Sequence, residues 1–289
     1  MHFTGGEPFL RPDLLSLVRR VKQKGMYCNI TTNGTLIHET DAYEVVRSGL
    51  DSLNVSIDGP AEIHDVIRGK QGAFARSVAA IRLVQAAKTA LGSKTPNVTL
   101  ATTIVAGNMS RLTELVPLGS DLRAHLGFGY VFYTTEQMQQ DTNRALQRTT
   151  VAKPENQDIP DELKPVRSEE LAREVERIKR LARASGVSVT FGPDLTADEI
   201  RMRYHDDAYA FVDKCFYPWY AMRINPYGDV YPCSLQVPMG SVRESSIADI
   251  WNGARYVAFR SVLKRRRLFP SCAKCCALSF RAWQSLPRL

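Results

Sequence analysis

The 289-residue chain contains no apolar run near the ~20 residues that a membrane-spanning helix requires. Its first residues show no basic segment followed by an apolar stretch, which predicts a cytoplasmic protein without a secretory signal or a membrane partner. There is also no low-complexity tract, internal repeat, phosphate-binding glycine loop or nucleophile elbow. The length of 289 residues allows one large domain plus a smaller one, and 44% hydrophobic and 24% charged residues are typical of a soluble globular protein.

The chain is basic, with 38 Lys and Arg against 30 Asp and Glu, a net charge of +8. Part of the excess comes from the run Lys264-Arg265-Arg266-Arg267. Such a run can contact nucleic acid, but no nucleic-acid motif and no interleaved aromatic residues accompany it. We therefore interpret it as a solvated helix face and do not expect nucleic acid as a partner.

In the first half of the chain, short apolar runs alternate with amphipathic stretches of helical spacing, as in βαβ units. Such repeats predict a parallel sheet that closes, wholly or partly, into a barrel. The polar stretch 134–168 predicts a long loop or a lid, and Ser168 begins a helix that reaches Ala184. The predicted strands cover residues 1–4, 27–31, 52–57, 98–105, 127–133 and 187–191.

Five of the six cysteines lie in the C-terminal part of the chain, and four of them form two separated pairs. Cys215 is followed by twelve residues, Gly228, four residues and Cys233, and the pair Cys272 and Cys275 comes after a long gap. The length of the chain disfavours a disulfide framework, whereas two converging pairs of thiolates hold a metal ion or an iron–sulfur cluster. The residues alone leave zinc and iron–sulfur equal. A hairpin at 220–225 and 229–232 and a helix at 247–267 complete a small module.

The remaining two cysteines receive weaker assignments. Cys276 is a spare thiol or a substitute ligand, and Cys28 lies in a predicted strand as a small core residue.

The segment Gly5-Gly6-Glu7-Pro8 follows a predicted strand and precedes a predicted helix. Two glycines let the backbone approach a ligand closely, and the carboxyl end of a barrel strand is where ligands bind. The whole string from Phe3 to Leu10 is more specific than a plain turn between a strand and a helix. At this point the chain resembles the radical S-adenosylmethionine (SAM) enzymes.

This resemblance implies an α/β fold, a partial (β/α)6 TIM-like barrel, in which the Gly-Gly-Glu-Pro turn meets the amino group of SAM. Further segments resemble the family at residues 29–35 and 55–60, and Arg68 is expected to pair with the SAM carboxylate. A carboxylate for an ammonium and a guanidinium for a carboxylate are chemically matched. The implied SAM-binding residues are Thr4, Gly5, Gly6, Glu7, Asn33, Ser56, Asp58 and Arg68.

The cysteine module resembles the SPASM extension of these enzymes, or its shortened form Twitch. The resemblance implies one auxiliary [4Fe–4S] cluster bound by Cys215, Cys233, Cys272 and Cys275, and it favours iron–sulfur over zinc. We therefore expect two domains, a truncated radical SAM barrel at 1–191 and an iron–sulfur module at 192–289.

Radical SAM enzymes hold their catalytic [4Fe–4S] cluster with a Cys-x3-Cys-x2-Cys motif upstream of the Gly-Gly-Glu-Pro turn. The chain begins two residues before Phe3, so we expect a barrel missing its first strand and no activity from the chain as given. No catalytic residue is assigned. A catalytic cluster is expected only if upstream cysteines exist. The alternatives are a noncatalytic SAM-fold binding protein, a binding module stabilised by zinc on four cysteines, and SAM-dependent methyl transfer by a related fold.

If completed upstream, the chain is expected to be an oxidoreductase or a peptide or protein maturase. The resemblance implies a 5′-deoxyadenosyl radical that abstracts a hydrogen atom from the substrate. It also implies a peptide, a protein side chain or a small molecule as substrate, and an external electron donor such as flavodoxin or ferredoxin.

Overall fold

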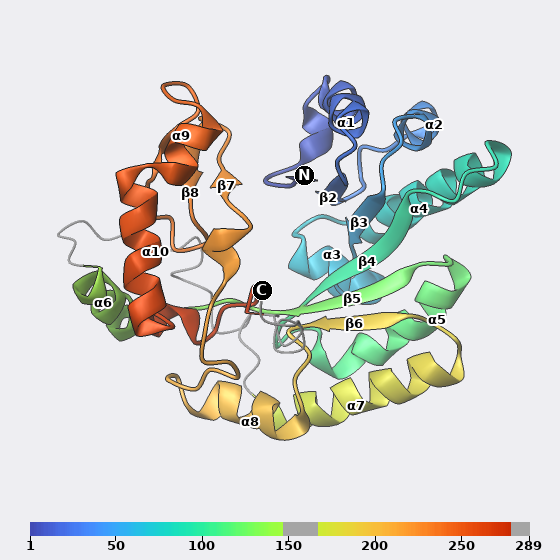
Figure 1. Cartoon of the computed structure of the whole chain (residues 1–289). Helices are drawn as coiled ribbons and strands as arrows, with labels where there is room; N and C mark the ends of the chain where they lie inside the picture. Colours follow the sequence, from blue (N-terminus) through green and yellow to red (C-terminus); the bar gives the residue numbers. More distant parts are fainter. Residues whose placement is uncertain (147–166, 279–289) are drawn as a thin grey trace. The chain divides into compact units, whose positions relative to one another are not determined.

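The computed structural model describes residues 1–146 and 167–278 (Figure 1). The chain forms two compact units, one of Met1–Tyr130 with Glu169–Phe191 and one of Val131–Ser168 with Gly192–Leu289. The second unit therefore includes the segment Val131–Ser168, which the predicted division between residues 191 and 192 had placed in the first domain.

The first unit is built on a six-stranded sheet with the strand order β1-β2-β3-β4-β5-β6. Neighbours from β1 to β5 pair in parallel, with Phe3 opposite Ile30 and Thr32 opposite Val55. This sheet confirms the predicted α/β fold class. Its strands are β1 (His2–Phe3), β2 (Asn29–Thr32), β3 (Ser52–Ser56), β4 (Asn97–Ile104), β5 (His125–Tyr130) and β6 (Val189–Gly192).

Apolar side chains explain both the strands and the helices that cover them. Leu53 and Val55 in β3 are completely buried, as parallel strands covered by helices require. Helix α1 (Leu14–Gln23) buries Leu14, Val18 and Val21 along one face. In Figure 1, α1, α2, α4, α5 and α7 lie along the outer side of the sheet. The remaining elements of this unit are η1 (Pro8–Leu10), α2 (Glu39–Arg47), α3 (Ala61–Ile67), α4 (Ala73–Ala90), η2 (Met109–Glu114), α5 (Leu115–Asp121) and α7 (Ser168–Ala184).

The predicted loop or lid at 134–168 is wrong at its start, where a helix, α6 (Glu136–Ala145), forms instead. The Thr135 side chain accepts the N–H of Met138 at 3.2 Å and caps the helix. The polar composition of this segment had led us to predict a loop. Residues 147–166 of this prediction lie outside the described residues.

The second unit contains a small antiparallel sheet and a helical segment. Strands β7 (Arg223–Ile224), β8 (Asp229–Tyr231) and β9 (Gly240–Ser241) form the sheet and confirm the predicted hairpin. The predicted helix at 247–267 is divided into α9 (Ile247–Asn252) and α10 (Ala254–Arg266), because Gly253 adopts an extended backbone. The other elements are α8 (Ala197–His205), η4 (Tyr217–Trp219) and η5 (Pro270–Cys272).

Among the described residues, no helix is both long enough and apolar enough to cross a membrane.

Candidate functional site

The predicted SAM-binding residues follow three adjacent parallel strands of the first unit. The segments after β1, β2 and β3 leave the sheet at the same edge, because the strands pair in parallel with matched register. Thr4, Gly5, Gly6 and Glu7 follow β1, Asn33 follows β2, and Asp58 lies two residues beyond the end of β3 at Ser56. The carboxyl edge of β1–β3 therefore gathers most of the predicted set.

Glu7 holds this edge together through both of its carboxylate oxygens. Oε1 accepts the N–H of Phe9 at 3.0 Å and the hydroxyl of Thr32 at 2.7 Å. Oε2 accepts the N–H of Asn33 at 2.8 Å. The carboxylate thus caps η1 and ties the turn after β1 to the end of β2, a role that the sequence-based assignment did not include.

The two glycines before Glu7 leave open space beside their backbone. Gly5 has a φ of +138°, which disfavours a side chain, and a Cβ atom placed on Gly5 or Gly6 would meet no atom within 4 Å. Both residues are exposed. Their backbone groups can therefore be reached by a ligand, which is the property that the glycine pair predicted.

Asp58 and Arg68 pair with each other. The Arg68 Nε donates to Asp58 Oδ2 at 2.6 Å, and Asp58 is buried whereas the Arg68 side chain is about one third exposed. Burial lowers the pKa of His64, whose Nδ1 accepts the N–H of Asp58 at 3.1 Å. Within the described residues the Nη atoms of Arg68 make no hydrogen bond, so they are available to a carboxylate.

Two buried side chains that the sequence analysis missed shape the same edge. Asn108 donates to the carbonyl oxygens of Asp58 at 2.7 Å and Thr103 at 2.9 Å. The Ser77 hydroxyl on α4 donates to the Asn33 carbonyl at 2.6 Å. Each of these hydrogen bonds joins residues more than 40 positions apart in the sequence, so no local motif could predict it.

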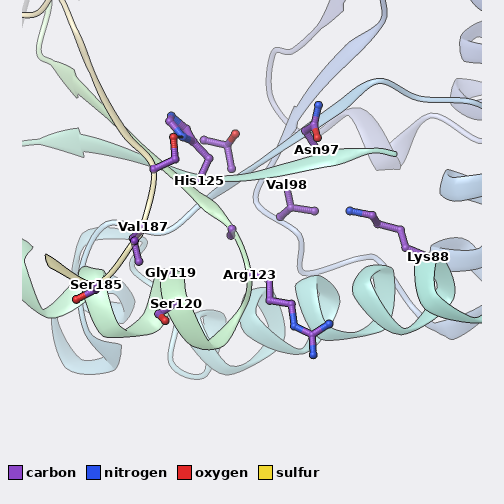
Figure 2. Close-up of a pocket in the computed structure, with 13 residues that line it drawn as sticks. Lys88, Asn97, Val98, Gly119, Ser120, Arg123, His125, Ser185 and Val187 are labelled. Atoms are coloured by element: carbon purple, nitrogen blue, oxygen red, sulfur yellow. Dashed lines mark hydrogen bonds between the residues drawn. The ribbon is translucent and has the colours of Figure 1, made fainter. Parts of the chain in front are cut away.

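A cavity of about 520 Å³ lies elsewhere in the first unit, at the amino ends of β4 and β5 (Figure 2). Both ring nitrogens of its His125 are hydrogen-bonded, with Nδ1 2.9 Å from Ser188 Oγ and Nε2 2.8 Å from Thr190 Oγ1. Lys88, in the last turn of α4, suits the negative end of that helix. The cavity contains none of the predicted site residues, and we assign no cofactor to it.

In the second unit, three of the four predicted cysteine ligands lie in or against one apolar core, and Cys275 is near enough to Cys272 to influence its pKa. Cys272 is part of this core, and Cys215 and Cys233 pack against it. Burial and, to a smaller extent, the neighbouring Cys215 thiol raise the pKa of the Cys233 thiol to about 12. Burial and then the charges of Cys275, Cys233 and Cys215 raise the pKa of Cys272 well above its ordinary value. The four thiols thus lie near enough to oppose one another's ionisation, a conflict that binding to an iron or zinc cation relieves.

The thiols do not form a compact site for one metal ion. Within the described residues, no group of three or more His, Cys, Asp or Glu side chains is arranged to hold a single ion.

Hydrogen bonds hold the segments that carry the cysteines. The N–H of Cys215 donates to the Arg267 carbonyl at 3.2 Å. Arg260 lies 4.0 Å from the Trp251 ring centre and donates to the Pro218 carbonyl at 2.8 Å, which fixes the segment after Cys215. Cys276 is exposed, and Cys28 is completely buried in the first unit, as expected for a core residue.

Comparison with known families agrees with this geometry. The model of the radical SAM superfamily matches residues 1–101, and the model of the SPASM iron–sulfur cluster-binding domain matches residues 215–276. These matches cover the carboxyl edge of β1–β3 and all four predicted cysteine ligands.

Curated relatives point to the same class of protein. An AdoMet-dependent heme synthase of Oleidesulfovibrio alaskensis is 28% identical over 283 residues, which is 94% of this chain and 66% of that protein. A PqqA peptide cyclase of Granulibacter bethesdensis is 30% identical over 274 residues, which is 88% of this chain and 61% of that protein. The chain thus spans about two thirds of the length of these relatives.

Solved structures share the fold. SuiB of Streptococcus suis has a TM-score of 0.63 at 15% identity, covering 90% of this chain and 57% of that one, and it has also been solved with its precursor peptide SuiA. The protein anSMEcpe with bound AdoMet has a TM-score of 0.60 at 16% identity, covering 95% of this chain and 68% of that one.

The two matched domains define the class of protein, a radical SAM protein with an iron–sulfur cluster-binding domain. The chain belongs to the radical SAM superfamily and carries a SPASM domain, and these two domains imply SAM and iron–sulfur clusters as its cofactors.

Proposed function

We propose that this chain is the core of a radical SAM maturase that modifies a peptide or protein substrate. In this proposal the carboxyl edge of β1–β3 binds SAM, and Cys215, Cys233, Cys272 and Cys275 hold one auxiliary [4Fe–4S] cluster. The observation that carries it is the gathering of these cysteines in the SPASM-matched segment: Cys272 lies in the apolar core, Cys215 and Cys233 pack against that core, and burial together with the thiols of Cys215, Cys233 and Cys275 raises the pKa of Cys272.

The first unit contributes positioning groups. The accessible Gly5-Gly6 backbone receives the amino group of SAM. The Glu7 carboxylate fixes that turn by its hydrogen bonds to the end of β2. Asp58 orients Arg68, whose Nη atoms receive the carboxylate of SAM, and the polar side chains of Asn33 and Ser56 contact the remaining part of the ligand. When bound with its catalytic cluster, SAM supplies the 5′-deoxyadenosyl radical for hydrogen abstraction. An external flavodoxin or ferredoxin is the proposed electron donor.

Similarity to a peptide cyclase favours a peptide substrate, and the net charge of +8 suits an acidic peptide. The similarity to a heme synthase supports a second candidate, a precursor of heme as substrate. The two substrates are separated by supplying each to the reduced protein and identifying the modified product by mass spectrometry.

Metal analysis after anaerobic reconstitution tests the cluster. The wild-type chain should hold about four iron and four sulfide ions per chain in its auxiliary site, and Cys233→Ser should lose most of them. Cys28→Ala is the matched control and should keep them, because Cys28 lies in the other unit. Zinc in place of iron, or equal metal content in Cys233→Ser and the wild type, would contradict the proposed cluster.

The activity needs its own experiment. The gene product, including any in-frame segment upstream of Met1, should release 5′-deoxyadenosine from SAM under anaerobic reduction. Asp58→Asn should reduce this release, since it leaves Arg68 without its partner at the site. Release that is unchanged in Asp58→Asn would argue against the assigned SAM edge.

A further inference from the structure

Lys274, which lies between Cys272 and Cys275 in the sequence, is an unusual residue of the second unit. Its side chain is completely buried, with a relative exposure of 0%. A buried lysine is rare in proteins, because removing an ammonium from water costs several kcal/mol unless the charge is compensated. The residue therefore requires a physical reason for its place in the Cys-Ala-Lys-Cys segment.

The ammonium is bound by the end of a helix from a distant part of the sequence. Nζ donates to the carbonyl oxygens of Arg203 at 2.5 Å, Asp206 at 2.5 Å and Tyr209 at 3.4 Å. Arg203 lies in the last turn of α8, and Asp206 is its C-cap residue. The last carbonyls of a helix have no partner within the helix and carry its negative end, so a cation is favoured there.

The connection is reciprocal. The Arg203 guanidinium, itself buried, donates through Nη2 to the Lys274 carbonyl at 2.6 Å and to the Val131 carbonyl at 2.9 Å. Each of the two residues thus binds the other's backbone with its charged side chain. Hydrogen bonds from charged donors are stronger than neutral ones, so this pair holds residue 274 firmly against the end of α8.

The start of the same segment, at Ser271, is held by helix α6. The N–H of Ser271 donates to the Thr142 hydroxyl on α6 at 2.9 Å, and the Ser271 hydroxyl donates to the Met138 carbonyl at 3.1 Å. Within the segment, the N–H of Cys275 donates to the Cys272 carbonyl at 3.0 Å. Both cysteines therefore lie on a short turn that is fixed at its start by α6 and near its end by α8.

We propose that Lys274 is a positioning residue of the auxiliary cluster: its ammonium fastens the Cys272–Cys275 turn to the end of α8, so that both thiols are held in place before the cluster assembles. This inference rests on the proposed cluster for its functional meaning. The anchoring itself is a property of the chain without iron.

The turn can be tested through the reactivity of Cys272, which is only 7% exposed. The rate at which N-ethylmaleimide labels Cys272 in the metal-free chain, followed by mass spectrometry, reports local opening of the turn. Losing the bonds of the ammonium in Lys274→Met should raise this rate about 10- to 100-fold. Cys28, buried at 0% exposure in the first unit, should label at an unchanged rate and serves as the internal control for global unfolding.

Four variants separate anchoring from packing. Lys274→Gln keeps two N–H donors but removes the charge, so its labelling rate should lie between those of the wild type and Lys274→Met. Lys274→Arg should restore a rate near that of the wild type, and Lys264→Met, at an exposed lysine of α10, should change nothing. If filling the buried space were what mattered, Met would protect Cys272 at least as well as Gln.

Iron content and the electron paramagnetic resonance signal of the reduced, reconstituted chain give the second readout. They should decline in the order wild type, Lys274→Gln, Lys274→Met. Equal Cys272 labelling in Lys274→Met and the wild type would overturn the inference, as would faster labelling in Gln than in Met. If the wild type binds no iron while Cys272 labelling follows the predicted order, the proposed cluster fails and the anchoring by Lys274 stands.

Discussion

Glu7 offers a direct test of how the SAM edge is held together. Its carboxylate accepts hydrogen bonds from Phe9, Thr32 and Asn33, at 3.0, 2.7 and 2.8 Å. In Glu7→Gln the amide oxygen can replace Oε1, but the amide NH2 group must then face the N–H of Asn33. One charged hydrogen bond is lost and two donors oppose each other. Since a hydrogen bond to a charged group contributes about 1.5–3 kcal/mol, we expect the free energy of unfolding to fall by about 2 kcal/mol.

The same change should weaken SAM binding. If the lost free energy falls entirely on the conformation of the Gly5-Gly6 turn, the binding-competent fraction decreases by at most about 30-fold, and so does the apparent affinity. Equilibrium dialysis of the chain with SAM measures this loss. A weaker affinity with unchanged stability would mean that Glu7 contacts the ligand directly.

Urea unfolding with two probes locates the effect. Maleimide labelling of the buried Cys28 reports the first unit, and fluorescence from Trp219 and Trp251 reports the second. Glu7→Gln should lower the urea midpoint of Cys28 labelling and leave the fluorescence midpoint unchanged. Glu39→Gln, an exposed carboxylate in the first turn of α2, is the matched control and should cost less than about 1 kcal/mol. A Cys28 midpoint equal to that of the wild type would refute the role assigned to Glu7.

Two further predictions concern the turns around the same edge. The N–H of Phe74, 2.8 Å away, is the main cause that holds the pKa of Asp65 below its ordinary value. The unfolded chain then binds this proton more readily, so the stabilisation is present above about pH 4 and is lost as the pH falls through the folded pKa. Asp65→Asn should remove this component from urea midpoints measured between about pH 3 and 7, and an unaltered pH profile would contradict it. Gly34→Ala should cost about 1–3 kcal/mol in chemical unfolding, because φ is +76° and the new Cβ would lie 2.9 Å from Val55 Cγ1. Gly25→Ala shares the positive φ without the contact, so equal costs would exclude the steric part.

Much of the fold was accessible from the sequence because its signals are local. The alternation of buried strands and amphipathic helices predicted a parallel sheet, and each observed strand of the first unit overlaps a predicted one. Helix α6 was not predicted because the side that it buries is largely polar. Its Thr142 donates a hydrogen bond to Ser271, which is distant in the sequence. The undivided helix at 247–267 was wrong for a smaller reason, since one glycine, Gly253, suffices to separate two helices.

The sequence by itself determined which residues are candidates for chemistry: the glycine pair before Glu7, the acid after β3, and the spacing of four cysteines. Only the tertiary structure decided how these groups are used. The Glu7 carboxylate accepts a hydrogen bond at the end of β2, and the Nε atom of Arg68 donates one to Asp58. The Lys274 ammonium donates to the carbonyl oxygens at the end of α8. These partners lie 26, 10 and 71 positions apart in the chain, and no local pattern encodes contacts that arise only when folding brings distant backbone and side chains together.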